Sequence, residues 1–217
     1  MENINIVIKF MPYLIQGLGY TLLVSVAAIV IAVCVGVILS LIRLSKYTIL
    51  HKFVAVYVSF VRGTPIIVQI FLIYYVIAMI GLDISALISG IVALSLNSGG
   101  FMAEILRGGL STIPKGQYEA AMALGMPKYK IWFRIIFPQV FNKVIPQMTS
   151  EFINVIKMSP MLSIIAVIEL TRTAQRLVSQ TYVTLPFYIT IGIIYFIVCA
   201  LLEEIVKYQE RRVKDRR

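Results

Sequence analysis

Five long apolar runs, separated by short polar stretches, organise this chain. The runs occupy about residues 13–42, 53–80, 85–106, 144–168 and 185–205. A helix needs about 20 apolar residues to cross the hydrocarbon core of a bilayer, so each run is long enough. The pattern predicts an all-α integral membrane protein with five transmembrane helices in a single domain, residues 1–217. Residues 1–12 are expected to form an apolar lead that lies in the membrane interface.

The overall composition agrees with a membrane protein. Hydrophobic residues make up 59% of the 217 residues and charged residues only 14%, and the mean hydropathy is +0.90. A soluble domain of this size cannot bury so large an apolar fraction, whereas a bilayer accepts it directly. The net charge of +10 lies in bands between the apolar runs, a pattern typical of membrane topology. The charge therefore does not indicate a nucleic-acid partner.

The positions of Lys and Arg predict the orientation in the membrane. With the N-terminus outside, most of these residues fall in the inner polar stretches, and only Lys9, Arg172 and Arg176 lie outside. Cytoplasmic loops carry an excess of Lys and Arg. We therefore expect a cytoplasmic C-terminus and a cytoplasmic loop over residues 107–143. Residues 169–183 are expected to form an exposed loop or a short helix.

Two helix-breaking residues interrupt the second apolar run. Pro65 removes a backbone donor and Gly63 lowers helix propensity, so we expect a kink or a break at this point. Irregular backbone at membrane depth is tolerated only against protein or a water-filled cavity. Arg62 and Thr64 therefore lie either at the inner interface, where Arg62 reaches lipid phosphate, or along a path through the membrane.

The third and fourth runs carry polar and ionisable side chains, namely Asn97, Ser98, Glu104, Glu151 and Lys157. An ionisable group at membrane depth costs a few kcal/mol by insertion scales, so such groups pair with one another or line water. We expect Lys157 either to form an ion pair with Glu151 or Glu104, or to line a polar path and meet a substrate carboxylate. Asn97 and Ser98 serve either helix packing or contact with a solute, and the two glycines that follow them permit close backbone approach.

No arrangement of residues indicates catalysis. The chain has no phosphate-binding Gly-rich loop and no dinucleotide fingerprint, so we do not expect it to bind ATP itself. His51 is the sole histidine, and Cys34 and Cys199 each lie inside an apolar run, which argues against a metal site and a disulfide. Two other classes remain open, an ion-coupled secondary transporter and a non-transporting membrane assembly protein. No internal repeat of the kind common in secondary transporters is visible.

A basic amphipathic stretch, residues 111–143, separates the third and fourth runs. A short helix is expected to open at Glu119 and to break at Gly125, and Pro138 is expected to close the turn-rich segment that follows. A helix of so few turns is not stable without a partner surface. That surface is either the membrane interface, which suits the lysines and aromatic side chains of this stretch, or a groove on another protein.

Within this stretch lies a spacing that resembles the cytoplasmic EAA loop of ATP-binding cassette (ABC) importer permeases. The matching residues are Glu119, Ala120, Ala121, Gly125, Ile135, Phe137 and Pro138, with Phe137 where Leu is usual. Three further segments resemble the polar amino-acid permease branch of that family, namely residues 62–65, 104–109 and 138–139. The resemblance covers nearly the whole chain. It implies a type I importer fold with five spans and a location in the bacterial cell membrane.

The resemblance also implies partners. These are a second permease subunit, identical or a sister chain, two cytoplasmic ATPase subunits that bind ATP and Mg²⁺, and an extracytoplasmic solute-binding protein. No cofactor or metal is expected in the chain itself. Transport of an amino acid delivered by the binding protein is the implied function.

Roles for individual residues follow from the same resemblance. Coupling to the ATPase falls to Glu119, Ala120, Ala121, Gly125, Ile135 and Pro138, with Met122 in the contact. The expected substrate path is lined by Thr64, Asn97, Ser98, Glu104, Glu151, Lys157 and Met158. Met158 stands where the branch often has Asp or Asn, which makes a cationic amino acid a less favoured substrate and a neutral one, such as cystine, a candidate.

Overall fold

The computed structural model describes residues 2–82 and 84–214, and the side chains of residues 5–82 and 84–207. Every regular element in these residues is helical. In chain order the elements are α1 (Glu2–Leu44), α2 (Thr48–Gly63), α3 (Ile66–Met79), α4 (Ala86–Ser111), α5 (Lys115–Ala123), α6 (Lys128–Ile131), the π-helical turn η1 (Trp132–Ile136), α7 (Phe137–Met158), the 3₁₀ segment η2 (Ser159–Ile165), α8 (Leu170–Thr181) and α9 (Leu185–Lys214).

Among the described residues, three helices are long and apolar enough to cross a bilayer without interruption: α1, α4 and α9. Two bent pairs bring the possible crossings to five. One pair is α2 with α3, at 114°, and the other is the run from Lys128 to Ile165 with α8, at 47°. The expected separate lead over residues 1–12 is instead the first part of α1, at least from Glu2. Val7 and Leu14 are buried against α8 and α9, and this packing holds the helix together through Pro12.

The predicted break at Gly63 and Pro65 is confirmed. Helix α2 ends at Gly63, Thr64 and Pro65 are extended, and α3 begins at Ile66. A break leaves backbone carbonyls of the preceding turn without helical partners. The amide of Gln69 satisfies them, because its Nε2 donates to the carbonyl oxygens of Val61 (2.9 Å) and Thr64 (3.2 Å).

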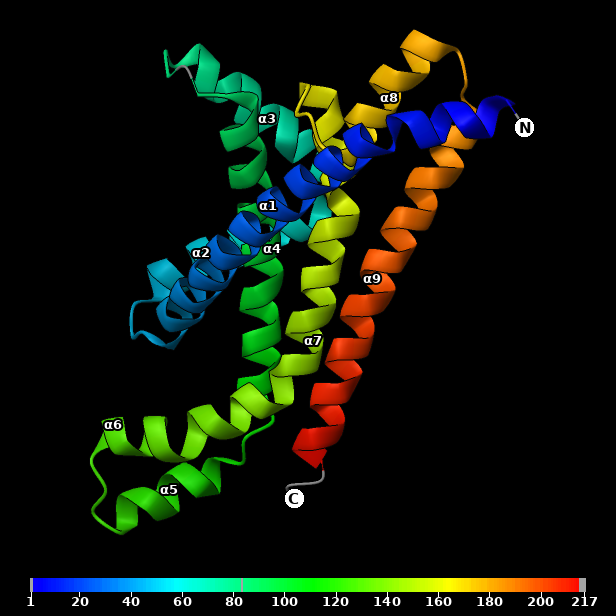
Figure 1. Ribbon diagram of the computed structural model, residues 1–217. Coiled ribbons are helices and arrows are strands. Elements are labelled where there is room, and N and C mark those ends of the chain that lie inside the picture. Colours follow the sequence, from blue (N-terminus) through cyan, green and yellow to red (C-terminus); the bar gives the residue numbers. More distant parts are fainter. Residues whose placement is uncertain (1, 83, 215–217) are drawn as a thin grey trace.

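Helix α4 is the centre of the bundle, and α1 crosses it diagonally (Figure 1). Glycines on both helices allow this crossing to be close. A Cβ added to Gly36 would lie 2.5 Å from Cβ of Met102, and one added to Gly99 would lie 2.5 Å from Cγ1 of Val35. The close approach expected near the paired glycines of the third run is therefore confirmed as helix packing.

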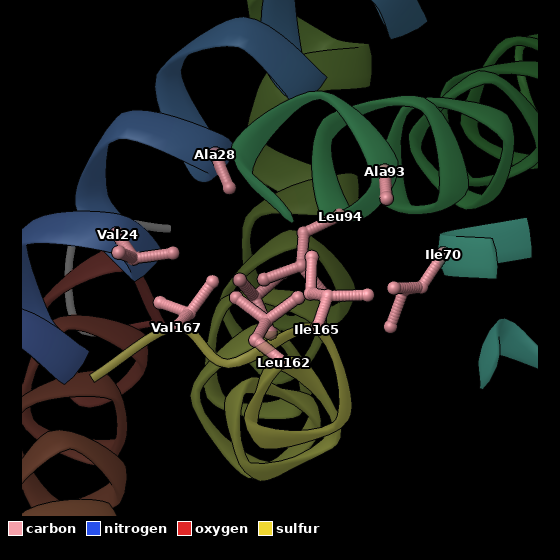
Figure 2. Packing of buried hydrophobic residues seen from close by; sticks show 9 residues of the cluster. Val24, Ala28, Ile70, Ala93, Leu94, Leu162, Ile165 and Val167 are labelled. Atoms are coloured by element: carbon pink, nitrogen blue, oxygen red, sulfur yellow. The ribbon is translucent and has the colours of Figure 1, made fainter. Parts of the chain in front are cut away.

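The largest apolar core joins α1, α3, α4, α7 and η2 near the end of the bundle where α3 and η2 lie. Figure 2 shows Val24 and Ala28 of α1, Leu94 of α4 and Leu162 of η2 pointing toward one another. Ile70 of α3 closes this core on one side. The core positions the α2–α3 break beside α4 and α7.

Residues 170–181 form helix α8, so the short-helix alternative for this stretch is confirmed. One face of α8 is buried through Leu170, Ala174 and Leu177, which contact α1 and α9. The mean hydropathy of this stretch is low, but its apolar residues recur with a helical period and form a stripe along one face of α8.

Helices α5 and α6 project from the opposite end of the molecule to α3 and α8 (Figure 1). Helix α5 begins at Lys115, four residues before the expected start at Glu119, because Pro114 supplies extended backbone at its N-cap. Gly125 ends it with φ +74°. The expectation that Pro138 closes a segment is wrong. Pro138 lies in the first turn of α7, where the missing backbone donor has little effect, and α6, η1 and α7 follow without a gap.

Candidate transport path and coupling segment

A row of buried polar side chains links α3, α4 and α7. Nδ2 of Asn97 donates to Oε1 of Gln69 at 3.0 Å, and the hydroxyl of Ser98 donates to Oε1 of Glu151 at 2.8 Å. All four side chains are buried. Thr64 joins the row at the helix break, because its Oγ1 accepts a hydrogen bond from Gln69 at 2.9 Å. The structure thus brings together four of the expected path residues, Thr64, Asn97, Ser98 and Glu151, and adds Gln69.

The row is not fully satisfied by the protein. Glu151, only 6% exposed, accepts hydrogen bonds from Ser98 and, at 3.4 Å, from Nδ2 of Asn154, and it has no cationic partner in the described part of the chain. Oδ1 of Asn97 is buried without a hydrogen-bond partner there. Buried polar groups normally find partners, and those that do not are candidates for contact with water or a solute. The row therefore has unused hydrogen-bonding capacity.

Lys157 lies outside this row, and the expected ion pair with Glu151 or Glu104 is wrong. The Lys157 side chain is exposed and forms no ion pair within the described residues. Six residues along an α-helix rotate a side chain by about 240°, so Lys157 points away from the face of α7 that carries Glu151. Met158 is also off the row, since it packs against the apolar core of Figure 2.

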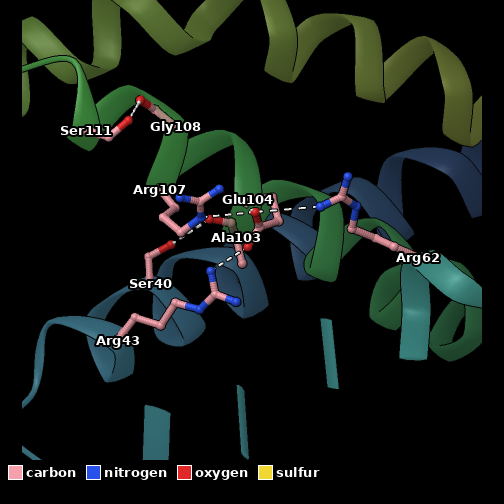
Figure 3. Close-up of polar contacts among 8 residues, drawn as sticks. All are labelled: Ser40, Arg43, Arg62, Ala103, Glu104, Arg107, Gly108 and Ser111. Atoms are coloured by element: carbon pink, nitrogen blue, oxygen red, sulfur yellow. Dashed lines mark hydrogen bonds and ion pairs between the residues drawn. The ribbon is translucent and has the colours of Figure 1, made fainter. Parts of the chain in front are cut away.

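Glu104 belongs to a separate cluster of charges. Arg43 of α1 and Arg62 of α2 both form ion pairs with it, the second at 3.6 Å, and Arg107 on its own helix pairs with it at 2.9 Å (Figure 3). The structure therefore places Glu104 in an ionic contact between three helices. Arg62, for which lipid contact and a path position were both open, joins α2 to α4 in this chain.

The α5–α6 segment is fixed to the bundle by buried contacts. Ala121 is buried with Ile131, Ile136 and Met102 of α4. The methyl group of Ala121 therefore faces the bundle, and its expected role in coupling stays a prediction. Among the other residues expected in coupling, Glu119, Ala120, Gly125, Pro138 and Met122 are exposed, and Ile135 is half-buried.

Hydrogen bonds strengthen this attachment. The amide of Gln139 in α7 donates to Oε1 of Gln117 in α5 at 2.7 Å, and Nζ of Lys143 donates to Oγ1 of Thr112 at 3.0 Å. Both bonds join α7 to the stretch between the end of α4 and α5. The segment is therefore attached to both α4 and α7.

The segment exposes four large apolar side chains, with charged residues such as Glu119 and Lys128 also exposed around them. We call the exposed side chains of Met122, Leu124, Tyr129 and Phe133 the α5–α6 patch. Leu124 and Phe133 are 81% and 70% exposed, although both are large hydrophobic residues. Exposed apolar patches mark sites of contact with protein or membrane. Gly125 lies inside the patch, and a Cβ added there would meet no atom within 4 Å. The requirement for glycine comes from the positive φ alone.

A buried carboxylate at the start of α8 was missed in the sequence. Glu169, expected in an exposed segment, is fully buried and caps α8, because it accepts from the backbone N–H groups of Thr171 (2.9 Å) and Arg172 (2.6 Å). The hydroxyl of Tyr195 in α9 also donates to it, at 2.8 Å. The sequence signal that could have found it is an acidic residue immediately before an amphipathic helix.

Comparisons with known proteins agree with this architecture. The family model described as binding-protein-dependent transport system inner membrane component matches residues 32–215. The L-cystine transport system permease protein TcyB of Bacillus subtilis is 37% identical over 206 residues, which cover 94% of this chain and 88% of the relative. The putative glutamine transport system permease protein GlnP of Rickettsia typhi is 35% identical over 210 residues, which cover 95% and 96%.

A solved structure is similar over almost the same length. A crystal structure of an amino acid ABC transporter with histidines superposes with a TM-score of 0.89 at 35% identity and covers 94% of this chain and 96% of that chain. An inward-facing MetNI methionine ABC transporter superposes at 0.74 with 22% identity, which supports the fold alone. The all-α, type I importer permease fold is thus shown. Members of this family are permease subunits without enzymatic activity of their own. The chain belongs to the family of binding-protein-dependent transport system inner membrane components, the permease subunits of ABC importers.

Proposed function

We propose that this chain is the permease subunit of an ATP-driven importer for a polar amino acid, and that the α5–α6 patch is the surface through which a separate ATPase moves it. The observation that carries the proposal is the contrast within one segment. Ala121 and Ile131 are buried against α4, whereas Leu124 and Phe133 on the other side are open. A segment that is anchored on one side and exposes large apolar side chains on the other suits transmission of force from a partner protein.

Partners follow from the family. Two ATPase subunits would bind ATP and Mg²⁺ on the cytoplasmic side, and a second permease subunit, identical or a sister chain, would complete the path. An extracytoplasmic solute-binding protein would deliver the amino acid. The proposed arrangement has five spans in the bacterial cell membrane, with the N-terminus outside and the C-terminus in the cytoplasm, as the positions of Lys and Arg favour.

The proposed path follows the polar row beside the helix break. Gln69, Asn97, Ser98 and Glu151 offer both donors and acceptors at one level of the bundle, next to a point where two helices join at 114°. Broken helices with polar side chains near them are typical of solute sites in transporters. Alternating access would move the helices around this row while the substrate is bound.

The polar amino-acid class rests on the relatives, whose names specify L-cystine and glutamine among others. Met158 is no longer a guide to the substrate, because its side chain packs in the core. We therefore propose the class and not a single member.

Reconstitution tests the proposal. The permease, its ATPase and its binding protein, in liposomes loaded with ATP, should take up a polar amino acid only while ATP is hydrolysed. Uptake that an ion gradient drives without ATP would instead indicate a secondary transporter. Failure to co-purify with any ATPase would indicate an assembly protein. A reporter fused after Arg217 should be cytoplasmic. Cleavage of this reporter by external protease would overturn the proposed orientation.

A further inference from the structure

A cavity of about 480 Å³ lies where the end of α1, the start of α2 and the end of α4 meet. It is separate from the polar row and from the α5–α6 patch. Its lining combines positively charged, hydroxyl and apolar side chains: Ser40, Arg43, Leu44, His51, Arg107, Leu110 and Ser111.

The charge beside this cavity is not balanced. Three guanidinium groups, from Arg43, Arg62 and Arg107, share the single carboxylate of Glu104 (Figure 3). No other ion pair occurs in the described part of the chain, so the cluster carries an excess of two positive charges there. The side chains of Arg62 and Arg107 are 53% and 55% exposed and can reach a further anion. Arginine presents five N–H donors in a planar fork, and the bonds of Arg107 to Glu104 use only Nε and Nη2.

The remaining polar lining suits the same ligand chemistry. Nε2 of His51 lies 2.6 Å from the carbonyl oxygen of Ser45, which accepts a hydrogen bond but cannot donate one. That geometry assigns the ring proton to Nε2 and leaves Nδ1 free. Phosphate oxygens are the acceptors that such a set of donors fits best.

Apolar side chains continue from the cavity along α1. Leu44 and Leu110 line the cavity itself, and Leu41 and Ile38 are exposed on the preceding turns of α1. A soluble anion gains nothing from these contacts, whereas an acyl chain attached to a bound phosphate does.

We propose that this cavity binds the phosphate headgroup of an anionic phospholipid, with an acyl chain along Ile38 and Leu41. Basic pockets between membrane helices on the cytoplasmic side bind anionic headgroups by the same chemistry. The lipid supplies the negative charge that the protein lacks, and it fixes the ends of α1, α2 and α4 together. Placement in the cytoplasmic leaflet rests on the orientation proposed above, whereas the headgroup site itself does not.

Lipid retention tests the proposal directly. The assembled complex is extracted in mild detergent, and the phosphatidylglycerol and phosphatidylcholine bound to each permease are counted by native mass spectrometry. Wild type should retain phosphatidylglycerol in preference to phosphatidylcholine. Arg107→Gln should weaken retention about fivefold, the factor expected from about 1 kcal/mol per arginine near a charged membrane surface. Arg176→Gln is the matched control, because Arg176 lines a different cavity at the other end of the molecule, and it should not change retention.

Several results would overturn the proposal: equal retention of both lipids, no change in Arg107→Gln, or an equal loss in the control. Complete displacement of lipid by millimolar inorganic phosphate would reassign the cavity to a soluble anion. Arg107→Lys keeps the positive charge and should retain lipid, and this result would separate the loss of charge in Arg107→Gln from misfolding.

A second measurement needs no variant. Phosphatidylglycerol with a photoreactive headgroup, incorporated in vesicles with the wild-type complex, should form adducts within residues 40–51 and 107–111. Adducts spread evenly over α9 would contradict the site. Neither readout depends on ATP or transport, so failure here leaves the importer function untouched. Adducts formed only from the outer leaflet would overturn the proposed orientation and leave the headgroup site standing.

Discussion

Replacing Leu124 in the α5–α6 patch tests whether this surface binds the ATPase. Leu124 is 81% exposed, so nearly all of its side chain is available for burial in a partner groove. Full burial of a leucine side chain contributes about 2 kcal/mol, which corresponds to a factor of about thirty in Kd. Leu124→Ser should therefore weaken binding of the ATPase about thirtyfold. Folding should change little, because substitutions at exposed positions usually alter stability by less than about 0.5 kcal/mol.

The assay is titration of purified ATPase onto the permease held in lipid nanodiscs, with the thermal midpoint of the permease as a measure of folding. Met79→Ser is the matched control, because Met79 is 85% exposed but lies at the end of α3, opposite to α5 and α6 (Figure 1). It should leave the Kd unchanged. A Kd for Leu124→Ser within twofold of wild type, or an equal loss in both variants, would refute the assignment of this surface to the ATPase.

Three other substitutions test the turn, the polar row and the α8 cap. Gly125→Val should impair ATP-driven uptake, since a side chain at φ +74° adds at least about 1–2 kcal/mol of backbone strain. Gly116→Ala, in an open position without positive φ, should leave uptake normal. Equal uptake in both variants would show that strain at Gly125 does not affect transport. Glu151→Leu removes the acceptor of the Ser98 hydroxyl and should abolish uptake per assembled complex, whereas undiminished uptake would remove Glu151 from the path. Glu169→Ala removes the cap of α8 and should destabilise the protein by about 1–2 kcal/mol, measured as a lower thermal midpoint in detergent. An unchanged midpoint would contradict a structural role for the cap.

Features that depend on local sequence were predictable. The apolar runs identified the long helices, and Gly63 with Pro65 identified the break, because chain stiffness and backbone donors are properties of adjacent residues. The spacing from Glu119 to Pro138 identified the family, and its membership was confirmed by the family model. The expected helix start at Glu119 and the expected end of a segment at Pro138 were wrong, since helix ends depend on the packing around them.

Features that depend on which helix faces meet were not predictable. Arg43 and Glu104 are 61 residues apart in the sequence, and only the crossing of α1 over α4 brings them together. Gln69 appeared as a single polar residue in an apolar run, and its role follows from the break beside it. Ala121 and Leu124 are both apolar members of a short segment, and the side that each faces is fixed by contacts with α4. Pairing of Lys157 was expected from charge alone, and helix geometry excludes its meeting Glu151.

A photoreactive amino acid placed at Phe133 in the fully assembled, membrane-embedded transporter gives the most direct test of the central proposal, that α5 and α6 connect this permease to a separate ATPase. Illumination should yield a covalent product with the ATPase, and the same probe at Met79 should yield none. A probe at Phe133 that reacts only with lipid, in the presence and in the absence of ATP, would contradict the account.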